Sequence, residues 1–221
     1  PAGEYLALLN PESPRVIVSE FKGGYPEQRN DYSYGYDPDG ELRYFRTPTP
    51  GFPNGRSSIE GIVPPPHVNV PRGWFDAPIV LHVSSQLPGV TFRYTTDGSE
   101  PTESNGQLYT APLRIATTTV LRVAGFKPGL LPSVSVTHTY LFAEQILRQP
   151  NNPPGYPATW GTHGNNNQYF PGNRVPADYE MDPEIVNDPA YRDLMRQSLL
   201  ALPTMSLVCR VEDMFGAAGI Y

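Results

Sequence analysis

Prolines constrain the fold of this chain more than any other feature. The 221 residues include 27 prolines and 20 glycines, distributed along the whole length. Proline lacks a backbone donor and clashes with the preceding helical turn, so it interrupts helices and central strands. Short strands joined by turns are therefore favoured over a helical bundle. The 14 tyrosines suit half-buried strand faces, because their hydroxyl groups reach water.

Charge and hydropathy exclude several classes of function. The formal net charge is −6, and the Lys and Arg residues form no run. A nucleic-acid-binding protein concentrates basic residues on one face, so we expect no nucleic-acid partner. No apolar stretch approaches the roughly 20 residues of a membrane-spanning helix, so no such segment is expected. The single cysteine, Cys209, excludes an intrachain disulfide and leaves the cellular compartment open.

The first region, residues 1–55, is predicted to contain a few strands. A β-hairpin is expected where two apolar runs flank a turn rich in Asn and Pro. A tyrosine-rich run then precedes an Asp-Pro-Asp-Gly turn and one more short strand. These strands and their turns are predicted at 5–9, 10–14, 15–21, 32–36, 37–40 and 41–45. This small number of strands cannot bury a core. We therefore interpret the region as an incomplete β-domain.

Residues 56–74 are predicted to be a proline-rich linker. Three consecutive prolines, 64–66, indicate an extended and rather stiff spacer.

The second region, residues 75–142, has the clearest strand pattern. Short runs with period-two alternation are each ended by Gly or Pro, at a spacing typical of an immunoglobulin-like antiparallel β-sandwich. The predicted strands are 79–83, 90–96, 113–115, 118–126 and 134–142. The predicted core is Val80, Leu81, Val83, Phe92, Tyr94, Val120, Leu121, Val123, Tyr140 and Phe142. His82 and His138 are expected to face outward.

The third region, residues 143–221, has a different texture. Ala143–Leu147 either extends the last strand or forms a helical turn, and 151–174 is expected to be irregular. Asp-Pro pairs at 182 and 188 are helix-start signals. The second of them begins the best helix of the chain, whose expected common face comprises Tyr191, Leu194, Met195, Ser198 and Leu199. A strand over 204–210 is expected to follow.

Three stretches of the second region carry a resemblance. They are Tyr-Thr-Thr-Asp-Gly-Ser-Glu-Pro-Thr at 94–102, Leu-Tyr-Thr-Ala-Pro at 108–112 and Thr-Val-Leu-Arg-Val-Ala at 119–124. Together they closely resemble the carboxy-terminal β-sandwich module of chitobiases and β-hexosaminidases, over about residues 75–142. The resemblance implies a fibronectin-like fold and a non-catalytic spacer of the kind that recurs in exported bacterial proteins.

The first region is similar to the closing strands of a bacterial lamin-tail-like domain, through residues 3–9, 32–35 and 44–51. The opening strands of such a domain are expected before Pro1. The third region looks like the lead-in to a CotH-type domain, through residues 178–186 and 202–208. CotH-type domains resemble atypical protein kinases, whose nucleotide-binding parts are expected after Tyr221. No catalytic residue is therefore carried over from that family.

Several residue groups are candidates for a site. Asp97 and Glu100 are possible calcium ligands, but turn chemistry alone explains both residues. Trp160, Tyr169 and Phe170 have the aromatic faces that suit sugar rings, although anchoring an irregular loop is the favoured interpretation. Asp37, Asp39 and Glu41 have the alternate spacing of a calcium loop without its remaining ligands. The acidic residues from Asp178 to Asp188 could hold a cation or pair for acid–base chemistry on a sugar, but helix-cap and solvated roles are favoured. Cys209 is expected to be a buried, inert thiol.

The chain is therefore predicted to be mainly β, with the sandwich flanked by a partial β-domain and by a mostly irregular region with one or two short helices. No catalytic residue, metal ion or cofactor is expected. The leading hypothesis is a structural, spacer or assembly segment of a larger exported bacterial protein, outside the cell or on its surface. Its expected partners are other domains of the same polypeptide and further copies paired through strand edges. The alternatives are a glycan-binding module and an accessory region of a CotH-type atypical kinase.

Overall fold

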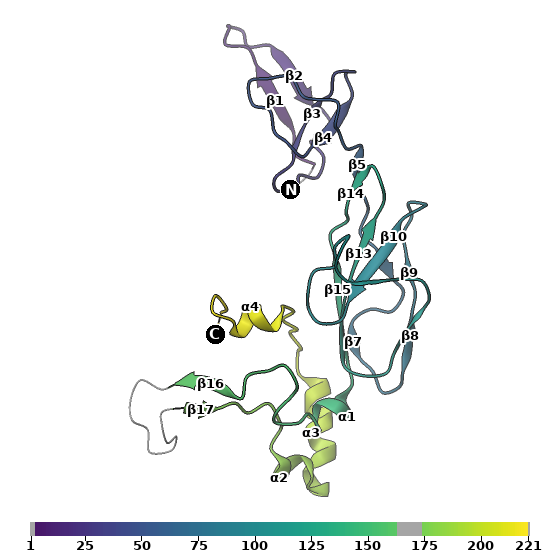
Figure 1. Cartoon of the computed structure of the whole chain (residues 1–221), viewed down its shortest axis with the longest axis vertical. Helices are drawn as coiled ribbons and strands as arrows, with labels where there is room; N and C mark the ends of the chain where they lie inside the picture. The colour runs from purple at the N-terminus through teal and green to yellow at the C-terminus, as the bar shows by residue number, and fades with distance from the viewer. Residues whose placement is uncertain (1–2, 163–173, 221) are drawn as a thin grey trace. The chain divides into compact units, whose positions relative to one another are not determined.

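The computed structural model describes residues 3–162 and 174–220. The chain forms two compact units, which are considered separately. Unit one comprises residues 1–62 and 128–131, and unit two comprises residues 63–127 and 132–221. Strands predominate in both units, so the prediction of a mainly β protein is confirmed. Figure 1 shows the order of the elements along the chain.

Unit one begins with the predicted β-hairpin. Strands β1 (Leu6–Leu9) and β2 (Ile17–Phe21) pair in antiparallel fashion. The Asn10 side chain shapes the connection, because its Oδ1 accepts a hydrogen bond of 2.7 Å from the backbone N–H of Val16. The apolar side chains of this hairpin remain largely exposed, including Leu8 at 64% and Val18 at 65%. The hairpin therefore buries little apolar surface, as expected for so few strands.

A second antiparallel hairpin follows, formed by β3 (Ser33–Tyr36) and β4 (Leu42–Phe45). Its turn depends on Asp37, whose Oδ1 accepts hydrogen bonds of 2.9 Å from the N–H groups of Asp39 and Glu41. This geometry is that of a side-chain-stabilised turn, which explains the Asp-Pro-Asp-Gly signal without a calcium ion. Strand β5 (Gly61–Ile62) pairs in parallel with β14 (Leu130–Leu131) and completes the sheets of unit one.

Unit two contains the β-sandwich. One layer is a five-stranded sheet in the order β11-β10-β13-β15-β7, and strand pairs β12-β8 and β6-β9 supply further strands. The strands are β6 (His67–Val68), β7 (Gly73–Trp74), β8 (Ile79–Leu81), β9 (Val83–Ser84), β10 (Thr91–Thr95), β11 (Gln107–Leu108), β12 (Leu113–Ile115), β13 (Thr119–Phe126) and β15 (Val136–Leu141). All these pairings are antiparallel except that of β15 with β7.

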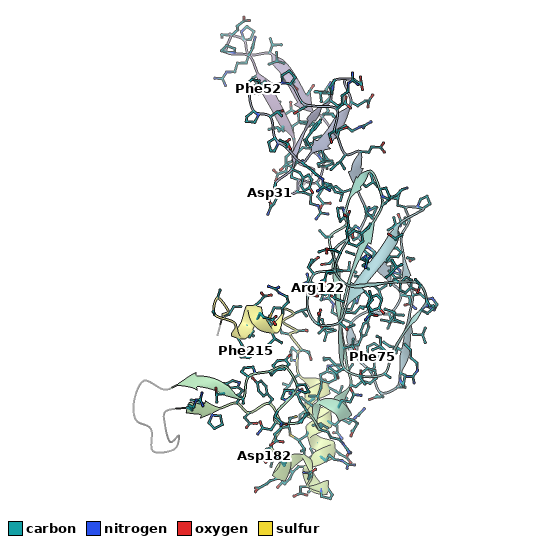
Figure 2. The ribbon with its side chains drawn as sticks, in the orientation of Figure 1. Asp31, Phe52, Phe75, Arg122, Asp182 and Phe215 are labelled. Carbon is teal, nitrogen blue, oxygen red and sulfur yellow. The ribbon has the colours of Figure 1, made fainter. Side chains whose placement is uncertain are left out.

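The sandwich core confirms most of the residues that alternation predicts. Its buried cluster consists of Val68, Leu81, Val83, Ile115, Leu121, Val123, Tyr140 and Phe142, and Phe92 and Tyr94 pack against it. Phe75 also packs there, with its ring centroid 5.7 Å from that of Tyr140, and Figure 2 shows its position. Val120 is half-buried and lies outside this cluster.

Two predicted orientations are wrong. Val80 is 50% exposed, because alternation along β8 cannot place both Val80 and its neighbour Leu81 in the core. His138, expected to face outward, is half-buried on the same face of β15 as Tyr140. The two rings stack with centroids 6.0 Å apart and an interplanar angle of 7°.

The predicted linker, residues 56–74, is not a bare spacer. Its second half belongs to unit two and contributes β6 and the edge strand β7 to the sandwich. Val63 is fully buried and Val68 is 7% exposed. The prolines at 64–66 therefore lie between two residues of the packed interior, a relationship that composition alone does not reveal.

The described part of the third region contains helices and a small hairpin. Strands β16 (Thr159–Thr162) and β17 (Arg174–Pro176) pair in antiparallel fashion. The helices are α1 (Ala143–Ile146), α2 (Pro183–Val186), α3 (Pro189–Ala201) and α4 (Val211–Phe215). Both predicted helix starts are confirmed: Asp182 accepts from the N–H of Glu184 at 2.9 Å, and Asp188 accepts from that of Ala190 at 2.8 Å.

Helix α3 has the predicted position but only part of the predicted face. Met195 and Leu199 are half-buried, whereas Tyr191 and Leu194 are 50% and 55% exposed. The inward face also includes Arg196, which forms ion pairs with Asp76 and Glu144. The periodicity of apolar residues did not predict Arg196 on this face, because Arg196 is held there by acidic groups next to the sandwich.

Candidate functional site

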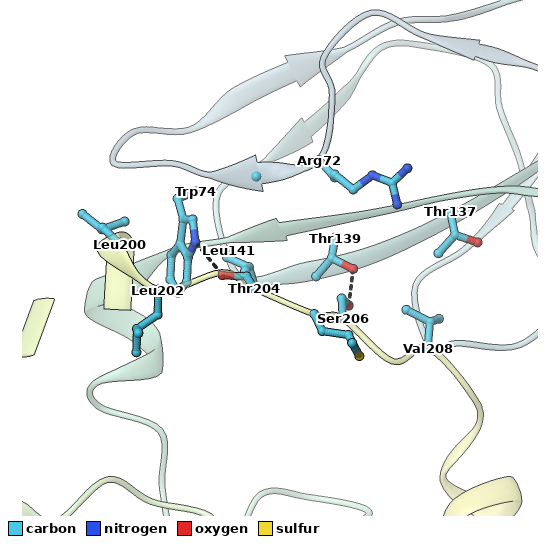
Figure 3. Close-up of a pocket in the computed structure, with 12 residues that line it drawn as sticks. Arg72, Trp74, Thr137, Thr139, Leu141, Leu200, Leu202, Thr204, Ser206 and Val208 are labelled. Carbon is cyan, nitrogen blue, oxygen red and sulfur yellow. Dashed lines mark hydrogen bonds between the residues drawn. The ribbon is translucent and has the colours of Figure 1, made fainter. Parts of the chain in front are cut away.

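Residues 203–209 run as extended chain beside the sandwich, and we call this segment the strap. The strand predicted over 204–210 is wrong in one respect, since none of these residues belongs to a sheet. Side chains hold the strap instead. The indole Nε1 of Trp74 donates a 3.2 Å hydrogen bond to Thr204 Oγ1, and the hydroxyl groups of Thr139 and Ser206 lie 2.6 Å apart. Figure 3 shows both hydrogen bonds.

The far end of the strap meets the turn that follows β10. Gly98 has a φ of +81°, a conformation that favours glycine. A Cβ atom at this position would overlap the carbonyl oxygen of Cys209 and would lie 2.9 Å from its carbonyl carbon. The glycine therefore permits both the turn and the close approach of the strap.

A groove of about 730 Å³ lies between the strap and the outer face of β15 and β7. Its walls combine alternate residues of β15, the start of β7, the end of α3 and the strap. The lining residues are Arg72, Gly73, Trp74, Thr137, Thr139, Leu141, Leu200, Leu202, Thr204, Met205, Ser206 and Val208. None of them is acidic, although the chain as a whole carries a net negative charge.

The two ends of the groove differ in character. Trp74, Leu200 and Leu202 gather at one end, and Arg72, Thr137 and the apolar Val208 lie toward the other (Figure 3). Arg72 forms no ion pair or hydrogen bond with any other residue that the structure describes. The hydroxyl groups of Thr204 and Ser206, which also line the groove, are already engaged with the sandwich. The groove is thus cationic at one end and apolar at the other.

The positive charge of Arg72 affects the pKa of its neighbour His138. Burial, followed by repulsion from Arg72 and then from His67, lowers the pKa of the His138 imidazole. The Nδ1 atom of His138 is buried and has no hydrogen-bond partner among the described residues. These surroundings therefore favour the neutral form of the imidazole over the charged form.

The two candidate calcium ligands, Asp97 and Glu100, are engaged in separate interactions. Asp97 Oδ1 accepts hydrogen bonds from the Ser99 hydroxyl at 2.6 Å and from its N–H at 3.0 Å. These bonds stabilise the charged carboxylate and lower the pKa of Asp97. Glu100 instead pairs with the guanidinium of Arg122, which also donates to the carbonyl oxygen of Gly98 at 3.0 Å. Both carboxylates thus support the turn, and Figure 2 shows where Arg122 lies.

Of the three candidate sugar-binding aromatics, only Trp160 lies within the described residues. Tyr169 and Phe170 lie outside them. Trp160 packs edge-on against Tyr179, with ring centroids 5.7 Å apart, and Tyr179 packs in turn against Tyr156. Phe215 extends this aromatic cluster through an edge contact with Tyr156 at 6.3 Å. Among these rings Tyr156 is 48% exposed.

The remaining chemically reactive groups are dispersed. Asp182 and Asp188 cap helices, as expected for the acidic residues of this segment. Cys209 is a free thiol and only half-buried, because it lies in the strap rather than in a central strand. Within the described ranges, no three His, Cys, Asp or Glu side chains gather in a way suited to a metal ion.

Sequence reasoning missed the groove. Arg72 lay in the predicted linker, and Thr139 and Ser206 are 67 positions apart in the chain. The available signal was the alternation of Thr204, Ser206 and Val208, which correctly indicates extended chain. Alternation does not indicate the partner of an extended segment, so the strap could not be assigned to the face of β15.

The fold of unit two defines a β-sandwich module. Residues 70–138 match the family model of the chitobiase/beta-hexosaminidase C-terminal domain. The predicted resemblance of the second region is therefore confirmed. The search of curated proteins and the search of solved structures found no match. In the part of the chain that the structure describes, no helix has the length and hydropathy needed to cross a membrane.

Proposed function

We propose that this chain is a non-catalytic structural segment that connects and positions neighbouring parts of a larger exported bacterial protein, outside the cell or on its surface. The observation that carries the proposal is the attachment of the strap to the sandwich. Side-chain hydrogen bonds join Thr204 to Trp74 and Ser206 to Thr139, and Gly98 admits the Cys209 carbonyl. The sandwich thereby fixes the course of the chain that follows it.

The engagement of the acidic side chains supports a non-catalytic role. General acid–base chemistry needs two carboxyl groups that face each other across a substrate site. The carboxylates singled out from the sequence have other partners instead: Ser99 for Asp97, Arg122 for Glu100, and helix N-termini for Asp182 and Asp188. We therefore infer that catalysis, where the parent protein has any, belongs to other parts of it.

The flanking regions extend the proposal to the partners. Residues 1–55 resemble the end of a lamin-tail-like domain, and residues 143–221 resemble the approach to a CotH-type domain. The exposed apolar side chains of the β1-β2 hairpin suit further strands or a second copy as a neighbour. In this arrangement the sandwich is the spacer between two domains of one polypeptide. An accessory role beside a CotH-type kinase domain is a variant of the same proposal.

Thiol reactivity tests the attachment directly, because the chain has a single cysteine and it lies in the strap. Alkylation of Cys209 in the native protein is expected to be much slower than in an unfolded control. Protease is expected to spare residues 203–209 until the sandwich unfolds. Alkylation at the rate of a free thiol, together with early cleavage of the strap, would falsify the positioning role. Hydrolysis of chitobiose or phosphoryl transfer from ATP by this chain alone would contradict its non-catalytic nature.

Glycan binding is a second candidate, favoured by the aromatic cluster around Trp160. Aromatic faces bind the apolar faces of sugar rings, and the matching family takes its name from enzymes that act on carbohydrates. A polysaccharide pull-down with chitin tests it, using the double variant Trp160→Ala, Tyr169→Ala. Loss of binding in the double variant supports this function, and binding that is unchanged removes the proposed site.

A further inference from the structure

The groove beside the strap is suited to a ligand, and its two different ends indicate which kind. Arg72 and Thr137 form a cationic, hydrogen-bonding end. Trp74, Leu200 and Leu202 form an apolar end, and none of the described residues that line the groove is acidic. A free guanidinium without an acidic neighbour attracts an anion, and the planar fork of Arg suits a carboxylate in particular.

The hydroxyl groups along the groove argue against ligands that are polar throughout. Thr204 already accepts the hydrogen bond of the Trp74 indole, and Thr139 is bonded to Ser206. A sugar chain or a peptide backbone needs polar partners along its whole length, and few unengaged groups remain here. An unbranched apolar chain needs none.

We propose that this groove binds an amphipathic carboxylate, with the carboxylate at Arg72 and Thr137 and an unbranched alkyl chain extending toward Trp74 and Leu202. The separation of the two ends sets the length of the chain. Thr137 and Leu141 are four residues apart on β15, a distance of roughly 13 Å at a rise of about 3.3 Å per residue. A saturated chain of about ten carbons spans that distance when extended. This binding activity goes beyond the structural role and does not depend on it.

Two independent features are consistent with a site of this kind. The groove, at about 730 Å³, falls within the roughly 300–1,000 Å³ of small-molecule sites. Leu202, at the end of α3, is 64% exposed. Its apolar side chain faces water and can therefore pack against the alkyl chain of a ligand. Binding of the alkyl chain removes this surface from water.

Decanoate is the probe, and calorimetric titration of the full chain is the measurement. A second readout is the fluorescence of Trp74, which a Trp160→Phe background isolates because the chain has two tryptophans. Saturable binding of decanoate is expected, with decanol and butyrate at least about tenfold weaker, since each lacks one of the two recognised ends. Arg72→Gln is expected to weaken decanoate about tenfold and to leave decanol unchanged.

Controls keep the result specific to the groove. Arg114→Gln removes an exposed cation on β12 and is expected to have no effect. Thr137→Val provides a second test of the polar end in case Arg72→Gln fails to fold, which thermal unfolding reports. The proposal is overturned by the absence of saturable binding, by equal affinity for decanol and decanoate, or by a neutral chitin oligosaccharide that competes for the groove. Loss of decanoate binding with normal protection of Cys209 would leave the structural role intact.

Discussion

Gly98, in the turn after β10, lies directly against the backbone carbonyl group of Cys209. Two separate requirements meet at this glycine: a φ of +81°, and a space too small for a Cβ atom. The same turn is held by Arg122, which donates to the Gly98 carbonyl and pairs with Glu100. The turn motif Asp-Gly-Ser-Glu-Pro thus shapes a loop of the sandwich and also the surface that the Cys209 end of the strap contacts.

Replacement of Gly98 by alanine is expected to release the end of the strap. Positive φ alone costs an L-residue about 1–2 kcal/mol, and the overlap with the Cys209 carbonyl adds to this cost. The protein relieves the overlap most easily by moving the strap, because the strap has no backbone pairing to lose. We expect a lower unfolding temperature together with faster alkylation of Cys209.

Gly155→Ala is the matched control for that experiment. Gly155 also lies in unit two and has a φ of +85°, but a Cβ atom there meets nothing within 4 Å. This variant is expected to lose about 1–2 kcal/mol from backbone strain alone, without any change in Cys209 reactivity. Equal rates of Cys209 alkylation in the two variants would show that the close contact at Gly98 does not hold the strap in place.

Thr139→Val is expected to loosen the middle of the strap. The substitution preserves shape but removes the hydroxyl group that is hydrogen-bonded to Ser206. Loss of one such bond costs about 1 kcal/mol, and Ser206, which is exposed, then bonds to water. Cys209 alkylation is expected to accelerate in this variant and not in Thr137→Val, since Thr137 faces the same groove without contacting the strap through a hydrogen bond. A double-mutant cycle with Ser206→Ala measures the coupling, and additive effects would argue against it.

The sequence predicted the strands of the sandwich well because their signals are local. Period-two alternation and Gly or Pro at the ends depend only on neighbouring residues, and β12 and the first hairpin lie where these signals put them. The prediction that Val80 lies in the core was wrong because a run of apolar residues does not show which of the two alternating faces points inward. Val68 was missed because two residues are enough for an edge strand but too few for a detectable period.

The groove could not be predicted for a different physical reason. Its parts come from β7, β15, α3 and the strap, and their meeting depends on hydrogen bonds between residues far apart in sequence. Hydroxyl groups on strand faces are common and usually bond to water. Nothing local distinguishes Thr139, which is bonded to Ser206, from Thr137, which is not. The Asp97 carboxylate, in contrast, bonds to Ser99 two residues away, and an Asp-Gly turn signal reflects such an interaction with adjacent backbone.

Protonation of His138 is expected to destabilise unit two. Burial, then Arg72 and His67, lower the pKa of this imidazole below its usual value of 6.5. The unfolded chain therefore binds a proton at a higher pH than the folded chain does. The contribution of His138 to the free energy of unfolding is then largest above about pH 6.5 and falls as the pH drops through and below that value.

The measurement is the unfolding temperature at several pH values between about 8 and 5. His138→Gln removes the titrating group while keeping a polar side chain, so the decline toward low pH is expected to be shallower in this variant. His82→Gln is the control, because His82 is exposed on the same unit. An identical pH slope in the wild type and in His138→Gln would contradict the assignment of the effect to His138.

Arg196 is expected to fasten α3 to the base of the sandwich mainly through charge. It pairs with Asp76, just after β7, and lies 3.9 Å from Glu144 of α1. Its side chain is partly exposed, so the loss in Arg196→Ala should stay within about 1 kcal/mol and should shrink as salt screens the pairs. Arg192→Ala, one turn earlier and exposed, is the control. Helix α3 leads directly into the strap, so loosening the helix is expected to expose Cys209. If Cys209 alkylation is faster in Arg196→Ala at low salt, and this acceleration disappears at high salt, the ion pairs of Arg196 are the first attachment point. A salt-independent effect would instead indicate that the aliphatic part of Arg196 holds the helix by packing.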